Sequence, residues 1–180
     1  MTMVYVSVGS NIDREKHIIA ALDALSAAFG TLLMSSVYES ESVGFDGAPF
    51  FNLAVGFETV LSVAELAALL RSIEHANGRQ RGEARFSART LDIDILTWGN
   101  ACGVQDGIRL PREEIVQNAF VLLPMAELAP DIKHPENGKT YATLWDEYDK
   151  SRQKLWRIPF CWRNARVGQN AGMQQGVVNE

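Results

Sequence analysis

Hydrophobic residues recur at two different spacings along the first hundred residues, and segments with the two spacings alternate along the chain. Short segments that alternate or are rich in β-branched residues predict strands at residues 3–8, 31–38, 51–59 and 90–98. Apolar residues three and four positions apart predict helices between them, at residues 14–29 and 62–76. The predicted order is therefore strand, helix, strand, strand, helix, strand.

This order predicts an α+β fold. Two interleaved βαβ units that share one antiparallel sheet, with both helices on the same face, form a ferredoxin-like βαββαβ core. The opposite face of the sheet would then be left for a functional site. The remaining chain predicts a C-terminal helical and strand extension, with a hairpin at 101–111, a helix at 120–128, a short helix that Thr140 caps, and a covering strand at 155–162.

The predicted helices carry recognisable end signals. Ser10, Asn11 or Asp13 is expected to cap the first helix, and Gly30 is expected to end it. Ser62, with Glu65 three residues later, predicts a capping box at the start of the second helix.

The length of 180 residues fits a single domain, which we expect to span residues 1–163. Residues 164–180 are polar and lack periodicity, which favours a disordered tail or a segment that orders only on a partner.

Charged residues are segregated within the segment Gly78–Trp98, GRQRGEARFSARTLDIDILTW. Its first half contains four arginines against a single acid, and its glycines allow a bent backbone. Its second half reads as a buried strand in which Leu91, Ile93, Ile95 and Thr97 alternate with Asp92, Asp94, Leu96 and Trp98.

The alternation places Asp92 and Asp94 on one face of the strand, with Cα atoms roughly 6.5 Å apart. Two carboxylates on an otherwise apolar strand lose hydration and repel each other, so they indicate a bound positive charge. Mg²⁺ fits this pair, because it takes one or two carboxylates and leaves its other positions to water and phosphate oxygens. The arginine-rich half suggests that the ligand is a polyphosphate.

The overall composition limits the other classes of function. The net charge of −5 gives no global basic field for nucleic acid or for an anionic membrane surface. The two cysteines have no metal-type spacing, and neither a signal peptide nor an apolar membrane span is visible. We therefore expect a cytoplasmic protein.

The segment GRQRGEARFSARTLDIDIL and the opening MTMVYVSVGSN resemble the signatures of the 6-hydroxymethyl-7,8-dihydropterin pyrophosphokinase family. The resemblance runs from residue 1 to about residue 145. The run RTLDIDIL is intact, whereas Phe86, Ser87 and Ala88 stand where the family has Trp-Gly-Pro.

The resemblance implies an enzyme of folate biosynthesis. Such an enzyme transfers the β,γ-pyrophosphoryl group of ATP to the hydroxymethyl oxygen of the dihydropterin and leaves AMP. The implied cofactors are two Mg²⁺ ions with ATP as co-substrate, and the implied partners are ATP and a pterin rather than nucleic acid or a membrane.

The resemblance also assigns the site residues. Arg79 and Arg89 would be catalytic, and Asp92 and Asp94 would bind the metal. The implied ATP-binding residues are Glu74, Arg79, Arg81, Arg85, Arg89, Ile95 and Arg112. The implied pterin-binding residues are Val43, Phe50, Asn52, Phe86 and Phe120.

Two further positions depart from the family pattern, and alternatives stay open. Arg112 stands where the family has a histidine, and Asn118 stands where it has an arginine. These departures slightly favour a diverged, non-catalytic relative that binds a nucleotide or a pterin. A ferredoxin-like nucleic-acid binder is a third reading, but the acidic pair and the negative net charge oppose it.

Overall fold

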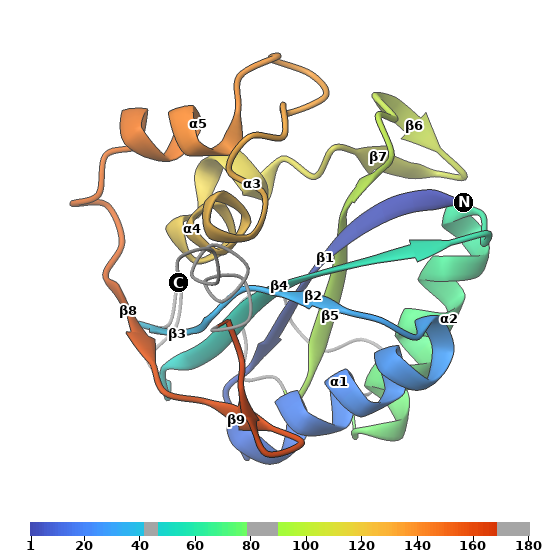
Figure 1. Ribbon diagram of the computed structural model, residues 1–180, viewed down its shortest axis with the longest axis vertical. Helices are drawn as coiled ribbons and strands as arrows, with labels where there is room; N and C mark the ends of the chain where they lie inside the picture. Colours follow the sequence, from blue (N-terminus) through green and yellow to red (C-terminus); the bar gives the residue numbers. More distant parts are fainter. Residues whose placement is uncertain (42–46, 79–89, 169–180) are drawn as a thin grey trace, which may run out of the picture.

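The computed structural model describes residues 1–41, 47–78 and 90–168, and its elements follow the predicted order (Figure 1). The first half of the chain forms β1 (Thr2–Ser10), α1 (Arg14–Phe29), β2 (Leu33–Met34), β3 (Val37–Ser40), β4 (Phe50–Thr59), α2 (Val63–Ala76) and β5 (Asp92–Trp98). The second half forms β6 (Gly103–Gln105), β7 (Ile108–Leu110), α3 (Glu114–Gln117), α4 (Ala119–Leu128), α5 (Tyr141–Glu147), β8 (Leu155–Ile158), β9 (Cys161–Trp162) and β10 (Ala165–Arg166).

One antiparallel sheet organises the molecule, with the strand order β5-β1-β4-β3-β8 and with β2 beside β4. Strand β1 lies between β4 and β5, and β4 lies between β1 and β3. Each βαβ unit is therefore split by a strand of the other. The predicted α+β fold with an antiparallel sheet is thereby confirmed, and the strand order is consistent with the ferredoxin-like arrangement.

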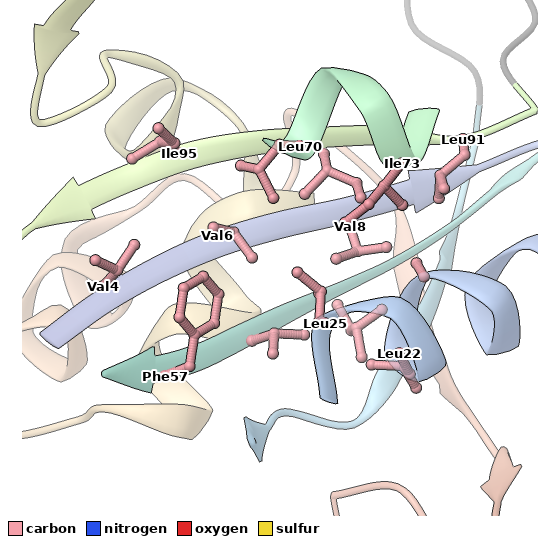
Figure 2. Close-up of a cluster of buried hydrophobic side chains, with 14 of the residues drawn as sticks. Val4, Val6, Val8, Leu22, Leu25, Phe57, Leu70, Ile73, Leu91 and Ile95 are labelled. Atoms are coloured by element: carbon pink, nitrogen blue, oxygen red, sulfur yellow. The ribbon is translucent and has the colours of Figure 1, made fainter. Parts of the chain in front are cut away.

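Helices α1 and α2 cover one face of this sheet and form the main core with it (Figures 1 and 2). Val4, Val6 and Val8 alternate along β1 and point toward the two helices. The helices contribute fully or nearly fully buried leucines, among them Leu22 and Leu70. Complete burial of one such side chain stabilises the fold by about 1.5–3 kcal/mol.

Most predicted helix ends are confirmed. Ser62 Oγ accepts a hydrogen bond from the N–H of Glu65, and the Glu65 carboxylate accepts one from the N–H of Ser62, which completes the capping box. Gly30 ends α1 with a positive φ of 78°. The predicted side-chain cap of α1 is wrong, because Asp13 adopts a left-handed conformation and makes no capping hydrogen bond.

The predicted strand at 31–38 is interrupted, and serines make the break. Ser35 Oγ accepts a hydrogen bond from the N–H of Ala54 at 2.9 Å, and Ser36 donates its N–H and its hydroxyl to Glu127. The side chains therefore compete with regular strand pairing, and the segment divides into β2 and β3.

The predicted alternation fails at the end of β5. The register with β1 shifts between Tyr5 and Val6, which pair with Thr97 and Ile95, so that Leu96 is an extra residue. This β-bulge turns Trp98 to the helix side, where its indole N–H donates to Leu61 O at 3.2 Å. Trp98 therefore does not share a face with the two aspartates.

The second face of the sheet is only partly free. Helices α3, α4 and α5 pack on it and form a second apolar cluster with Tyr5, Ala54 and Leu96 (Figure 1). The prediction that this whole face is left for a site is wrong. Among the described residues, this second cluster does not include Gly9, Asn52 and Asp92, which lie together at one end of the sheet.

The C-terminal segment joins the sheet at its far edge. Strand β8 pairs with β3, and the hairpin of β9 and β10 follows it. Phe160 and Val167 are buried in the helix-side core, and the domain boundary at residue 163 stays a prediction. Within the described ranges, no helix is long and apolar enough to cross a membrane.

Candidate functional site

Small and polar residues form one row across the free end of the sheet. Gly9 of β1 pairs with Asp92 of β5 on one side and with Asn52 of β4 on the other, and Asn52 pairs with Tyr38 of β3. Residues directly opposite each other in a sheet project from the same face. Because neighbouring strands lie about 4.8 Å apart, Asp92 and Asn52 are separated by roughly 10 Å, with Gly9 between them.

Gly9 is a residue of this row that the sequence did not predict, because the predicted first strand ends at residue 8. It lies inside β1, which runs on to Ser10. A Cβ atom at Gly9 would come within 2.9 Å of Asn52 Oδ1, so the asparagine side chain occupies the space that a larger residue would need. A glycine within a strand often marks such a close approach, and this was the available signal.

Asn52 is fixed in place by β3. Its side chain is buried, and its Nδ2 donates a hydrogen bond to Ser40 Oγ at 2.9 Å. Ser40 in turn pairs with Phe50, which lies two residues before Asn52 on the same face. The strand therefore presents an aromatic side chain and an amide on one face.

Tyr38 closes the row. Its hydroxyl donates to Glu127 at 2.8 Å, and burial raises its pKa to about 12. The phenol therefore stays protonated, and together with Glu127 it attaches α4 to β3.

Asp92 and Asp94 lie at the opposite end of the row. They alternate with the buried Ile93 and are themselves partly exposed. Their neighbours on β1 are Gly9 and Ser7, which are small and leave the carboxylates accessible from the site face. The predicted placement of both aspartates on one face is thus confirmed.

Among the described residues, Arg112 lies beside this pair. Its guanidinium lies 3.5 Å from Asp94 and 3.4 Å from Glu114, and its backbone N–H donates to Leu96 O. Burial acts to lower the pKa of Arg112, but the attraction of Asp94, Glu114 and Asp92 outweighs it, so the pKa rises above its ordinary value. Arg112 was expected to meet a phosphate, and here it contacts carboxylates.

The donor set fits a hard divalent cation. The structure brings together two carboxylates, and within the part of the chain that it describes no group of three or more histidine, cysteine, aspartate or glutamate side chains is assembled. Such a pair cannot complete an octahedral shell, so the remaining ligands would be water and phosphate oxygens, as Mg²⁺ commonly has.

The other predicted site residues lie in different environments. Glu74 is buried on α2, and Phe120 lies at the start of α4 against the second apolar cluster. Ile95 is 5% exposed and belongs to the helix-side core, so only its backbone could meet ATP. Val43, Arg79, Arg81, Arg85, Phe86 and Arg89 lie outside the described residues.

Asn118, which replaces a family arginine, has a structural partner. Gln153 Nε2 donates to Asn118 Oδ1 at 2.8 Å, and Gln153 Oε1 accepts the N–H of Ala119 at 2.8 Å. This amide pair joins the start of α4 to the segment after α5.

The two ends of the row are therefore suited to different ligand chemistry. The carboxylate end can bind a cation with its attached anions, and the amide end can hydrogen-bond the edge of a neutral, flat molecule. Only Gly9 separates the two ends, so one bound assembly can reach both.

Comparisons with known proteins point to one family. Residues 5–130 match the family model described as 7,8-dihydro-6-hydroxymethylpterin-pyrophosphokinase. A Bacillus subtilis protein named 2-amino-4-hydroxy-6-hydroxymethyldihydropteridine pyrophosphokinase is 35% identical over 159 residues, which cover 86% of this chain and 90% of that protein. A Pseudomonas aeruginosa protein of the same name is 37% identical over 137 residues, covering 74% and 84% of the two chains.

Solved structures agree on the fold. The structure of a Plasmodium falciparum HPPK-DHPS protein superposes with a TM-score of 0.65 at 14% identity. The match covers 88% of this chain but 47% of that longer one, and at this identity it shows the fold alone.

Proposed function

Since the chain belongs to the 7,8-dihydro-6-hydroxymethylpterin-pyrophosphokinase family and is an enzyme of that kind, we propose that its reaction runs between the two ends of the polar row. The hydroxymethyl oxygen of the dihydropterin attacks the β-phosphorus of ATP. The bond from that phosphorus to the α,β-bridging oxygen breaks, AMP leaves, and the hydroxyl proton passes to solvent. We expect this step of folate biosynthesis to take place in the cytoplasm.

The observation that carries this proposal is the alignment of Asn52, Gly9 and Asp92 in one register. A bicyclic ring can hydrogen-bond with its edge to Asn52, whose Oδ1 fills the space beside Gly9 that a side chain would otherwise take. Its substituent would then point toward Asp92 and Asp94, where the phosphates are held. The spacing of about two strands brings the reacting groups together without requiring either to leave its own subsite.

The pterin end works by stacking and edge recognition. Phe50 precedes Asn52 on the same face, and Phe120 lies on α4, which packs against β4. Two aromatic rings suit a pterin because its faces are apolar while its edge carries donors and acceptors. Val43 and Phe86 are expected to add contacts.

The phosphate end works by charge. Asp92 and Asp94 would hold Mg²⁺, expected as two ions, which would neutralise the triphosphate and lower the pKa of the attacking hydroxyl. Arg79 and Arg89 would stabilise the charge of the transferred group. Arg81, Arg85, Arg112, Glu74 and the backbone of Ile95 are expected to orient the nucleotide.

Arg89→Ala provides a test of the catalytic arginine. A group that acts mainly on the transition state contributes little to ground-state binding. We expect the single-turnover rate to fall by about 10²–10³-fold, while the Kd for MgATP changes by less than about fivefold. An equal loss in both quantities would make Arg89 a binding residue.

The decisive experiment for the function is AMP formation by the full chain. ATP, Mg²⁺ and 6-hydroxymethyl-7,8-dihydropterin are incubated with the protein, and AMP and the pterin diphosphate are separated by chromatography. One AMP per pterin diphosphate is expected, and omission of the pterin should abolish both.

A non-catalytic relative is the second candidate, and one observation favours it. Arg112, which the family resemblance assigns to ATP binding, contacts Asp94 and Glu114. Binding of MgATP or pterin without AMP formation would support this reading and would count against the proposed reaction.

A further inference from the structure

Residues 155–168, here called the C-terminal segment, contact the strands that form the pterin end of the site. They lie beyond the residues that match the family model, which end at 130. The segment pairs through its backbone with β3, whose Ser40 holds Asn52 (Figure 1). It also contacts β4, which carries Phe50 and Asn52, through a side chain of the core.

The contact with β3 is a register of strand pairs. Leu155 pairs with Ser40, and Arg157 pairs with Tyr38. Ser40 is the residue whose hydroxyl accepts the hydrogen bond of Asn52. Leu155 also packs against the second apolar cluster, so β8 holds the edge of β3 at the point where β3 holds Asn52.

The contact with β4 is made through Phe51, which lies between Phe50 and Asn52. The ring of Phe160 meets the ring of Phe51 edge-on, with centroids 6.3 Å apart and planes at 90°. The guanidinium of Arg14 lies over the Phe51 ring, 3.9 Å from its centroid. Because side chains alternate along a strand, fixing Phe51 on the helix side fixes the direction of its two neighbours on the site side.

One further contact lies within the C-terminal segment, and another joins this segment to the sheet. The N–H of Val167 donates to Phe160 O at 2.8 Å. Gly168 lies so close to the break between β2 and β3 that a Cβ atom there would come within 2.6 Å of the backbone nitrogen of Ser36. Phe160 is therefore held firmly where it meets Phe51.

We propose that the C-terminal segment is a positioning element for the pterin end of the site, with Leu155 acting through Ser40 and Phe160 acting through Phe51. Neither residue touches the substrate. The inference rests on the proposed function, because it takes Phe50 and Asn52 to be the pterin-binding residues.

Phe160→Leu and Leu155→Ala in the full chain test this inference. Phe160→Leu removes the ring that meets Phe51. Leu155→Ala keeps the backbone pairing with Ser40 but removes the side chain that packs β8 against the second apolar cluster. We expect the KM for 6-hydroxymethyl-7,8-dihydropterin to rise about tenfold in each, since small displacements of a positioning group have effects of this size or larger. The KM for ATP should stay within twofold of the value for the unaltered chain.

Phe29→Leu is the matched control. Phe29 stacks on Phe57 in the same core, with ring centroids 4.0 Å apart, but at the opposite end of β4. It should lower the melting temperature to a similar degree and leave the KM for the pterin unchanged. An unchanged KM in Phe160→Leu and Leu155→Ala, or an equal rise in Phe29→Leu, would overturn the inference.

The same variants separate this inference from the reaction itself. If the unaltered chain forms no AMP, the proposed reaction fails, and fluorescence titration with the pterin in the presence of MgATP still compares the variants. Weaker pterin binding confined to Phe160→Leu and Leu155→Ala would then support the positioning role. Equal pterin affinity in all variants and in the unaltered chain would refute it.

Discussion

The two faces of the central sheet are made by the same strands but differ in chemistry. On the helix side, Val6, Val55 and Ile93 belong to one continuous apolar core that α1 and α2 cover. On the other side, at one end of the sheet, the same strands present Gly9, Asn52 and Asp92. A period of two residues is sufficient to separate stability from binding across a single layer of backbone.

The difference extends along the site face itself. Toward one end of this face, Tyr5, Ala54 and Leu96 are covered by α3, α4 and α5. Toward the other end, the side chain of Asp94 is 27% exposed. Substitutions on the helix side should therefore alter stability first, and substitutions in the polar row should alter activity first.

Asp94→Ala should have the largest effect. It removes one of the two carboxylates expected to hold Mg²⁺, so we expect kcat for AMP formation to fall by at least about 10³-fold, as for loss of a main electrostatic contact in phosphoryl transfer. The melting temperature should change little, because the side chain is partly exposed and Arg112 keeps its contact with Glu114.

Asp23→Ala serves as the control for charge alone. Asp23 is an exposed carboxylate on α1 that contacts Arg163 and Trp162. Its loss should leave kcat within twofold. Retention of normal activity by Asp94→Ala would remove the metal assignment and, with it, the distinction between the two faces.

Asn52→Ala should have the next largest effect, and on a different quantity. The Kd for the pterin should rise by about 10²-fold, since loss of a group that hydrogen-bonds a polar edge leaves that edge unpaired in a dry site. The Kd for MgATP should stay within about threefold. Calorimetric titration of each ligand measures both, and equal weakening of the two ligands would mean that the row does not have two separate ends.

How far this division could be predicted from the sequence depends on the kind of signal. Strong local patterns predicted α1, α2 and β5 and the shared face of Asp92 and Asp94, because helix and strand periods are properties of neighbouring residues. The break at Ser35 and Ser36 depends on Glu127, some ninety residues away, and no local pattern contains it. The bulge at Leu96 likewise depends on pairing with β1.

The site shows the same limit. The pairing of Gly9 with both Asn52 and Asp92 is a property of the sheet and not of any one segment, so Gly9, which follows the predicted strand at 3–8, is not among the predicted site residues. The roles of Arg79, Arg81, Arg85 and Arg89 stay predictions from the resemblance, as do those of Val43 and Phe86.

Leu22→Ala probes the helix side. Leu22 is fully buried in α1, so its truncation leaves a cavity in the main core. The free energy of unfolding should fall by about 2–5 kcal/mol, as for other large-to-small core substitutions. Below the unfolding transition, the KM values for ATP and the pterin should be unchanged. Urea denaturation and steady-state kinetics at the same temperature check both parts, and a selective rise in one KM would contradict the separation of faces.

The smallest expected effect is on the pH dependence of stability, at the turn before α5, one of the helices that cover the site face. His134 is buried, lies edge-on to Tyr141 of α5, and accepts the N–H groups of Glu136 and Asn137 at Nδ1. Burial lowers the pKa of His134, against the raising influence of Glu136. The unfolded chain therefore binds more protons at this residue than the folded chain does, so stability falls as the pH drops below the ordinary value of 6.5.

His134→Asn isolates this contribution, because the amide oxygen can accept the same N–H groups but does not titrate. We expect the unfolding free energy of the variant to decline less than that of the unaltered chain between about pH 6.5 and pH 5, where the two protonation states exchange. Urea midpoints taken at half-unit intervals measure the difference. Parallel pH profiles would mean that protonation of His134 does not weaken the turn before α5, and that this cover is insensitive to pH at that residue.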